Sequence, residues 1–438
     1  MDLIDVRQLA LQIQEAWARP EPEELDAAGG TCPLPSQHVL ERLLSLCYRA
    51  SLMQEELRPV TFRLLVCEPG LLPAEAGPPL GLHRLLFVEP RGLSAHELRR
   101  LSPAAKYARS LVGVEEHPER GLSIWGIVHS GPRWMQEAQG GRDAAPPLPQ
   151  ALVIHVTGPG RLAVSRGRRT IFTIDSTRPS SPAMNVFGAR WLIKRFADVR
   201  AELMQLHAEA RQQQGPHWPA IDENLSRLVA QQMLKRLIAT IQAARHGATL
   251  LIVPTDGLQE LSVSSAVRIK YEFVAEEPRN RFRTLMVRLL NALAETGSRS
   301  GLPDPPVVTW QDYELAYDRR VAHLDESIFE MSHMIAALSQ VDGAVVITKR
   351  LELLGFGAEI GTLVDVPAVA RSMDCEGSRH IVEATSDVGT RHRSAYRFCN
   401  AVHDALAIVI SQDGEVRFTA WNEGYVMYWN HDASSPSR

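Results

Sequence analysis

The sequence of 438 residues has few cysteines and no long hydrophobic run. Its five cysteines are scattered, odd in number and never form a C-x-x-C pair, so neither a disulfide framework nor a zinc site is expected. No stretch of about eighteen uncharged apolar residues occurs, so a membrane-spanning helix is not expected. The first residues carry acids and lack the basic-then-apolar order of a secretory signal. We therefore expect reduced thiols, a cytoplasmic location and no membrane partner.

An excess of basic charge is also missing. The formal net charge is −4 at pH 7, whereas binding to nucleic acid through its phosphates needs clustered Lys and Arg, so no nucleic-acid partner is expected. The hydrophobic content of 45% and the charged content of 22% are ordinary for a globular protein. The length allows two or three domains, each with a sizeable core.

Proline and glycine divide the chain into two parts. Two prolines and a glycine end a helical run within residues 212–219, where we place the main boundary. The expected domains are residues 1–214 and residues 220–438. The first contains a glycine-rich and proline-rich loop at residues 133–150 and short apolar runs at 61–67, 85–88, 123–128 and 152–156 that are typical of buried or half-buried strands. Helical segments flank these runs, so this part is predicted to be α/β or α+β.

The second part alternates helical and strand patterns. Apolar residues recur at helical spacing over 221–241, 282–293 and 313–338, and short apolar runs that indicate strands occupy 247–254 and 344–347. This order predicts an α/β domain with a mixed central sheet flanked by helices.

A first motif, Asp342-Gly343-Ala344, opens an apolar strand. A carboxylate at such a strand edge can hold a divalent metal ion or accept a proton, and the glycine lets a ligand or another backbone segment approach closely. Taken alone, the motif is more typical of a plain turn at the start of a strand.

A second motif, Gly389-Thr390-Arg391-His392-Arg393, precedes a predicted helix. Arginine offers a planar fork of donors that matches phosphate oxygens, and a helix N-terminus favours anions. Thr390 adds a hydroxyl donor or caps the helix. In isolation, the two arginines would be ordinary surface charges.

A third feature is Ser411, which ends the apolar run of residues 405–410. The carboxyl end of a strand is a usual place for ligand contacts in α/β sheets.

Taken in order, these features resemble the diadenylate cyclase domain of DisA-type and CdaA-type proteins. The Asp-Gly-Ala motif, the Arg-His-Arg motif and the strand that ends in serine follow one another as in that family, and the similarity extends from about residue 220 to residue 429. The resemblance implies condensation of two ATP molecules into cyclic di-AMP and two pyrophosphates. It also implies a homodimer or higher homo-oligomer, because each domain holds one ATP and two domains meet face to face.

The resemblance implies roles for individual residues. Asp342 would bind Mg²⁺ or Mn²⁺, with Co²⁺ as a further candidate, and would assist deprotonation of the 3′-hydroxyl. Arg391 and Arg393 would hold phosphates and stabilise the departing pyrophosphate. The implied ATP contacts are Gly343, Ala344, Leu354, Gly355, Gly389, Thr390, Arg391, His392, Arg393 and Ser411.

Two further segments, 353–358 and 374–379, bear on the expected contacts with the adenine base. The first contains Leu354 and Gly355 and is a candidate wall for adenine, although a tight hairpin fits its two glycines equally well. The second is an extra-looking run where many family members have a short loop, and it puts the base contacts in doubt.

The first part of the chain is similar to the DACNV type of sensor domain, which precedes cyclase domains in some bacterial proteins. This similarity implies regulation by an unknown signal. Two other hypotheses remain open. One is a non-catalytic sensor that binds ATP or cyclic di-AMP, and the other is an interaction scaffold in which the second part only dimerises.

Overall fold

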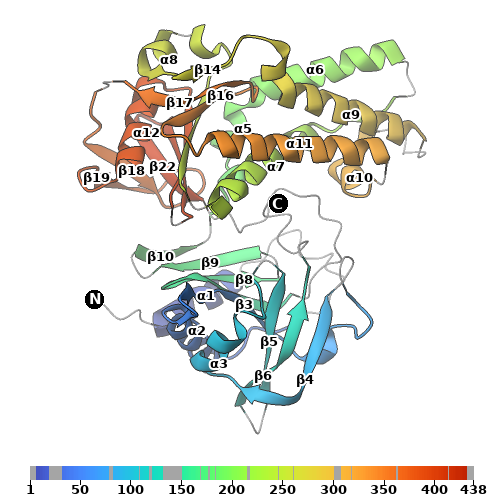
Figure 1. Ribbon diagram of the computed structural model, residues 1–438, viewed down its shortest axis with the longest axis vertical. Coiled ribbons are helices and arrows are strands. Elements are labelled where there is room, and N and C mark those ends of the chain that lie inside the picture. Colours follow the sequence, from blue (N-terminus) through green and yellow to red (C-terminus); the bar gives the residue numbers. More distant parts are fainter. Residues whose placement is uncertain are drawn as a thin grey trace. The chain divides into compact units, whose positions relative to one another are not determined.

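The computed structural model describes residues 6–18, 32–77, 82–107, 109–117, 121–131, 150–167, 169–175, 178–182, 184–214, 218–244, 246–259, 261–299, 307–316, 318–361, 364–412 and 414–431. These residues form two compact units of mixed α/β structure, residues 6–182 and residues 184–431 (Figure 1). No helix in these ranges is long and apolar enough to cross a bilayer. The expected glycine-rich and proline-rich loop of residues 133–150 lies almost entirely outside the described residues.

The first unit is built on one eight-stranded sheet with the strand order β10-β9-β8-β7-β3-β5-β6-β4. Its strands are β3 (Phe62–Val66), β4 (His83–Gly92), β5 (Ser110–His117), β6 (Gly121–His129), β7 (Leu152–Gly158), β8 (Arg161–Arg166), β9 (Arg169–Asp175) and β10 (Arg178–Pro182). A short ribbon of β1 (Gln54–Glu55) and β2 (Arg58–Pro59) lies outside this sheet, and the helices are α1 (Val6–Trp17), α2 (Gln37–Ser51) and α3 (Ala95–Leu101).

The two faces of this sheet have separate cores because side chains alternate along a strand. Phe62 and Leu64 of β3 pack with the apolar sides of α1 and α2. Leu65, on the opposite face, packs with Trp125 and Cys67. The expected strands at residues 61–67, 123–128 and 152–156 are confirmed, whereas the one at 85–88 is an exposed edge strand rather than a buried one.

The second unit is built on a ten-stranded sheet with the path β13-β17-β16-β12-β20-β21-β22-β18-β19, to which β14 adds by pairing with β17. Its strands are β12 (Ala248–Val253), β13 (Val267–Arg268), β14 (Tyr271–Glu272), β16 (Ala344–Thr348), β17 (Leu353–Ile360), β18 (Ala368–Ser372), β19 (His380–Ala384), β20 (Leu406–Ile410), β21 (Val416–Asn422) and β22 (Tyr425–His431). A separate parallel pair consists of β11 (Ala220–Ile221) and β15 (Val307–Val308).

Helices cover both faces of this sheet. They are α5 (Arg190–Arg195), α6 (Ala197–Gln214), α7 (Glu223–Ala244), α8 (Leu261–Ala266), α9 (Arg281–Arg299), α10 (Trp310–Glu314), α11 (Arg319–Leu338) and α12 (Thr390–Ala401). Leu250 of β12 belongs to the core under α7, α9 and α11, whereas its neighbour Leu251 belongs to the core under α8 and α12. The alternation along one buried strand thus makes a three-layer unit, as the strand and helix patterns predicted.

The division between the units lies near residue 184, earlier than the boundary that we expected after residue 214. The helices α5 and α6 precede that boundary but pack on the second unit. Trp191 of α5 stacks on Trp429 with ring centroids 4.1 Å apart, and Arg195 donates hydrogen bonds to the carbonyl oxygens of His403, Ala405 and Trp421. The glycine and prolines after residue 214 therefore end a helix inside the second unit.

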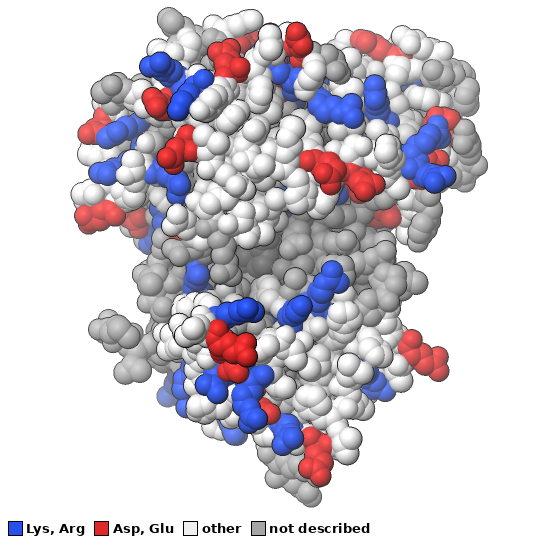
Figure 2. Space-filling model, viewed as in Figure 1, with Lys and Arg blue, Asp and Glu red and all other residues white. Residues whose placement is uncertain are grey.

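The helix expected over residues 313–338 is two helices. α10 ends at Glu314 and α11 begins at Arg319, with Asp318 as its N-cap. The Asp318 carboxylate accepts a hydrogen bond of 2.7 Å from the Arg320 N–H, which is the usual reason why aspartate starts a helix instead of continuing one. On the face of the second unit seen in Figure 2, acidic and basic side chains are interspersed around a broad uncharged area.

Candidate active site

Three strand ends of the second unit meet at one edge of its sheet. β12 runs parallel to β16 with Thr249 opposite Ala344, and antiparallel to β20 with Ala248 opposite Ile410. The starts of β12 and β16 and the end of β20 therefore lie side by side. We call this place the 342–411 edge, because it brings Asp342, just before β16, to the same side as Ser411, just after β20.

At this edge, Asp342 is exposed and is fixed by the glycine that follows it. Gly343 has a φ of 110°, and a Cβ atom there would lie 2.5 Å from the carbonyl carbon of Gly357. Any other residue would collide with the β17 backbone, so the glycine allows the segment before β16 to lie directly against β17. This contact sets the position of the Asp342 carboxylate on the rim of the sheet.

The start of α12 reaches the same edge. Gly389 is its N-cap and has no side chain to satisfy the first N–H groups of the helix. A Cβ atom at Gly247, just before β12, would lie only 2.8 Å from Nη1 of Arg391, so the Arg391 guanidinium rests directly on Gly247. The expected arrangement of a basic side chain and a helix N-terminus beside a strand end is therefore present for Arg391.

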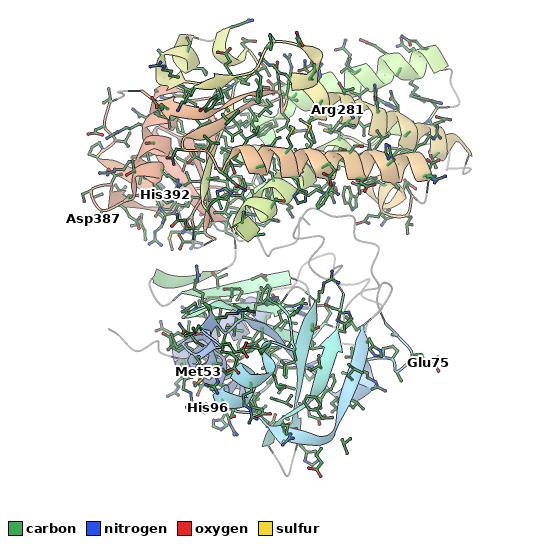
Figure 3. All side chains as sticks on the ribbon, in the orientation of Figure 1. Met53, Glu75, His96, Arg281, Asp387 and His392 are labelled. Atoms are coloured by element: carbon green, nitrogen blue, oxygen red, sulfur yellow. The ribbon has the colours of Figure 1, made fainter. Side chains whose placement is uncertain are left out.

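Arg393 is positioned differently. Because residues 390–401 are helical, side chains two positions apart point in directions about 200° apart. Arg393 is exposed, and no contact within the described ranges places it against the 342–411 edge. His392, between the two arginines, is half-buried with its ring centroid 6.5 Å from that of Tyr396. Figure 3 labels His392 in the first turn of α12 and Asp387 in the segment that leads into this helix.

The charged side chains of the motif residues are not paired with other side chains among the described residues. In the part of the chain that the structure describes, the side chains of Asp342, Arg391 and Arg393 make no hydrogen bond and no ion pair. Farther along α12, by contrast, Arg397 donates a 2.7 Å hydrogen bond to Asp365. The charges at the 342–411 edge thus remain available to a ligand.

Ser411 lies in a tight turn. Its Oγ accepts a hydrogen bond of 3.1 Å from the Glu415 N–H, and its own N–H donates to the Glu415 carbonyl oxygen at 2.8 Å. The hydroxyl hydrogen is still able to donate. The turn holds this donor at the edge beside Gly247.

The candidate adenine wall is part of a hairpin. β17 pairs antiparallel with β16, and Leu354 is only 2% exposed in the core. β14 covers Gly355 so closely that a Cβ atom there would lie 2.3 Å from the Tyr271 carbonyl oxygen. The hairpin alternative thus describes the local structure, and a contact of Leu354 or Gly355 with adenine stays a prediction.

Tyr271 is a residue that the sequence did not single out. Its ring is 44% exposed, stacks on Phe356 with centroids 4.8 Å apart, and lies 3.1 Å from where a Cβ atom of Gly357 would be. That same Cβ position is 3.6 Å from the Asp342 carbonyl oxygen. Tyr271 stands in a two-residue strand with no periodicity, far from the motifs in sequence, so no pattern could have pointed to it.

A divalent cation at Asp342 would need ligands beyond the protein. Among the described residues, no group of three His, Cys, Asp or Glu side chains is arranged to enclose a metal ion. Mg²⁺ usually binds through one or two carboxylates together with substrate phosphates and water, rather than in an all-protein cage. One exposed carboxylate fits that mode of binding and does not fit a structural metal site.

The segment 374–379 lies in the connection between β18 and β19 and packs on α5. The Cys375 carbonyl oxygen accepts a hydrogen bond of 2.9 Å from Trp191 Nε1, and the Glu376 carboxylate accepts one from the Arg190 N–H. This segment thus has a structural role in holding α5 to the sheet.

Comparison with known families finds one match within the first unit. Residues 30–129 match the family described as "Probable sensor domain DACNV". They span α2 to β6, and the similarity of the first part of the chain to this type of sensor is thereby confirmed.

The other comparisons are not informative about function. No curated protein matches the chain. Among solved structures, a hypothetical membrane spanning protein from Bacillus cereus is 14% identical, and the match covers 55% of this chain and 91% of that chain with a TM-score of 0.24. At such a TM-score, neither fold nor function is inferred from the likeness.

Proposed function

We propose that the chain is a diadenylate cyclase, in which the second unit condenses two ATP molecules into cyclic di-AMP with release of two pyrophosphates. The observation that carries this proposal is the 342–411 edge, where a carboxylate and a guanidinium that have no ion pair among the described residues come together with a helix N-terminus. The match of residues 30–129 to a sensor-domain family adds support, because this type of sensor precedes cyclase domains in some bacterial proteins.

The phosphates of ATP would bind at the start of α12. The first N–H groups of the helix and the Arg391 guanidinium are donors on one side of the edge, and the Ser411 hydroxyl is a donor on the other. Together these donors favour the binding of a polyanion, and their hydrogen bonds to the phosphates become stronger as negative charge accumulates on the leaving pyrophosphate. His392 and Arg393 would complete this set once ATP is bound.

Asp342 would accept the proton of the attacking 3′-hydroxyl. The 3′-oxygen then forms a bond to the α-phosphorus of the other ATP, the bond from that phosphorus to the pyrophosphate oxygen breaks, and two such steps close the ring. A divalent cation, Mg²⁺, Mn²⁺ or Co²⁺, held by Asp342 and the phosphates, would supply charge neutralisation and a lowered hydroxyl pKa. Tyr271 offers an exposed ring for stacking on adenine.

The reaction requires two copies of the chain. Each edge combines the exposed carboxylate of Asp342 with the N-terminus of α12, and such a set would hold one ATP in each copy. Each 3′-hydroxyl must reach the α-phosphate held by the other copy, which calls for a face-to-face homodimer. The first unit would regulate this encounter in response to a signal.

The test is incubation of the purified chain with ATP and Mg²⁺ or Mn²⁺, followed by chromatography for cyclic di-AMP. We expect Asp342→Asn and Arg391→Ala to lower product formation at least 100-fold, since each removes a group that acts on the transition state. Arg397→Ala is the matched control, because it removes an arginine of the same helix that pairs with Asp365, and it should retain activity within about twofold.

Three outcomes would count against the proposal. ATP binding without product under all metal conditions would favour the non-catalytic sensor. Product at the normal rate from Asp342→Asn would refute the role of the carboxylate. A rate strictly proportional to protein concentration at concentrations where the chain is monomeric would refute the two-copy requirement.

A further inference from the structure

A cavity in the second unit lies at the end of the sheet opposite to the 342–411 edge. It has a volume of about 70 Å³, and its lining includes Leu406, the first residue of β20, and Lys349 to Leu351, which follow the last residue of β16. A water molecule needs only about 10–15 Å³ of such space, so the cavity has room for a short hydrocarbon chain. It therefore differs from the candidate active site in place and in character.

The walls of this cavity are apolar. One wall comes from α5 and α6 and includes Leu192, Phe196 and Leu203, and the facing wall includes Phe282 and Met286 of α9. Figure 3 labels Arg281, the residue that precedes Phe282 at the start of α9. Apolar cavities of this kind are poorly hydrated and take up apolar ligands.

The lining also carries five basic side chains, of Arg200, Arg227, Arg283, Lys349 and Arg350. Most of these basic side chains form ion pairs with acidic neighbours. Glu202 pairs with both Arg283 and Arg350, Lys349 pairs with Asp404 at 2.5 Å, and Arg200 lies 3.8 Å from Glu223. One carboxylate thus serves two arginines, and the lining as a whole carries an excess of positive charge.

Arg227 is the basic group that lacks an ion pair within the described ranges. Its guanidinium makes only long contacts of 3.4 Å, to the amide oxygens of Gln231 and Asn224. Burial and the nearby Arg200 lower the pKa of Arg227, and Asp222 acts in the opposite direction without cancelling them. Two guanidinium groups close together beside an apolar cavity favour an anion between them.

We propose that this cavity binds a small apolar monocarboxylate, such as a short-chain fatty acid, with its alkyl chain between α6 and α9 and its carboxylate on Arg227 and Arg200. The cavity volume of about 70 Å³ is roughly half that of an apolar cavity of about 150 Å³ that takes up benzene, so it suits an alkyl chain of a few carbon atoms. The site is independent of the proposed cyclase reaction, and it couples α5 and α6, which follow directly on the first unit, to the sheet that carries Asp342.

Butyrate is the probe, and the full chain is titrated with it by calorimetry and by thermal unfolding. We expect saturable one-to-one binding and a rise in Tm, because the ligand binds the folded state only. Two ligands with the same alkyl chain, 1-butanol and butylamine, test the role of the carboxylate. Butanol should bind at least tenfold more weakly than butyrate, and butylamine should bind more weakly still.

Two variants test the location. Ala230→Leu fills the cavity from α7 while keeping a good helix former, and Arg227→Gln removes the unpaired cation. Each should weaken butyrate binding at least tenfold. Arg288→Gln, which replaces an exposed arginine of α9 outside the cavity, should leave the affinity unchanged.

Absence of butyrate binding to the wild-type chain would overturn the proposal. Equal affinity of the wild type and Ala230→Leu for butyrate would overturn the assignment to this cavity, and butylamine binding as tightly as butyrate would overturn the role of the arginines. The unliganded Tm of each variant shows that it is folded, because Ala230→Leu should not lower that of the wild type. None of these readouts depends on cyclic di-AMP formation.

Discussion

Replacement of Gly247 by alanine should disturb the 342–411 edge through a single methyl group. Gly247 has a φ of 69°, and the new Cβ would lie 2.8 Å from Nη1 of Arg391 and 3.1 Å from the Ile410 carbonyl oxygen. The left-handed backbone costs an alanine about 1 kcal/mol. The backbone contact adds a further cost, whereas the guanidinium, as the end of a flexible side chain, moves away.

The expected result is a small loss of stability and a large loss of function. A destabilisation of about 1–2 kcal/mol lowers the Tm of a unit of this size by roughly 2–8 °C. A displacement of Arg391 by about 1 Å would lower the rate of cyclic di-AMP formation by 10-fold to 100-fold, since misplacement of a binding group by that amount is costly. The assays are thermal unfolding and product chromatography on the same preparations.

Gly424→Ala is the matched control. Gly424 also has a positive φ, of 93°, but a Cβ atom there would meet nothing within 4 Å, and it lies in the β21–β22 turn at the opposite end of the sheet. This variant should show the backbone strain alone, with a similar loss of Tm and unchanged activity. In an Arg391→Ala background, Gly247→Ala should cause little further loss of activity, because the group that it displaces is gone. Equal activity of Gly247→Ala and Gly424→Ala would refute the reasoning.

Two further predictions concern the stability of the second unit. Burial lowers the pKa of His431 from 6.5 to about 3, so below pH 6.5 the unfolded state binds more protons than the folded state. The free energy of unfolding should therefore fall as the pH drops below 6.5, by about 1.4 kcal/mol per pH unit for this group. His431→Asn, which keeps an acceptor for the Val186 N–H, should flatten that slope in denaturant unfolding between pH 7 and pH 5, and an unchanged slope would exclude His431 as its source. Trp191→Ala removes the stack on Trp429 and the hydrogen bond to Cys375, and should destabilise the second unit by about 3 kcal/mol in urea unfolding, whereas an effect on the first unit alone would contradict the placement of α5.

Much of the secondary structure could be predicted because it rests on local patterns. The apolar run at residues 248–253 is buried along its whole length and could only be an inner strand or a short buried helix, and its flanking glycine and proline favour the strand. The start of α12 at Thr390 follows from Gly389 and the helical pattern after it. The break between α10 and α11 was not predicted, because Asp318 also fits the polar face of one continuous amphipathic helix. In the structure this residue is the N-cap of α11.

The unit boundary and the neighbours of the motifs could not be predicted from local patterns. The glycine and prolines near residue 216 mark the end of a helix, but they do not say on which core that helix packs, and the stack of Trp191 on Trp429 joins residues far apart in sequence. Tyr271 and Gly247 are likewise brought to the motif residues by strand pairing and by a helix packed on the sheet. Such contacts depend on register and topology, which single-residue preferences do not encode.

The sequence by itself determined that an acidic Asp-Gly turn opens a strand, that a basic triplet opens a helix and that a serine closes a strand, because each is a statement about consecutive residues. Only the tertiary structure decided that these three ends share one edge, since that depends on β12 running parallel to β16 and antiparallel to β20. It also decided that Arg391 rests on Gly247 while Arg393 points elsewhere, because a helix separates residues two apart by about 200°. The apolar cavity beside Arg227 likewise depends on the tertiary structure alone, because its lining includes residues of four helices, α5, α6, α7 and α9, and residues at or next to the strands β16, β20 and β21.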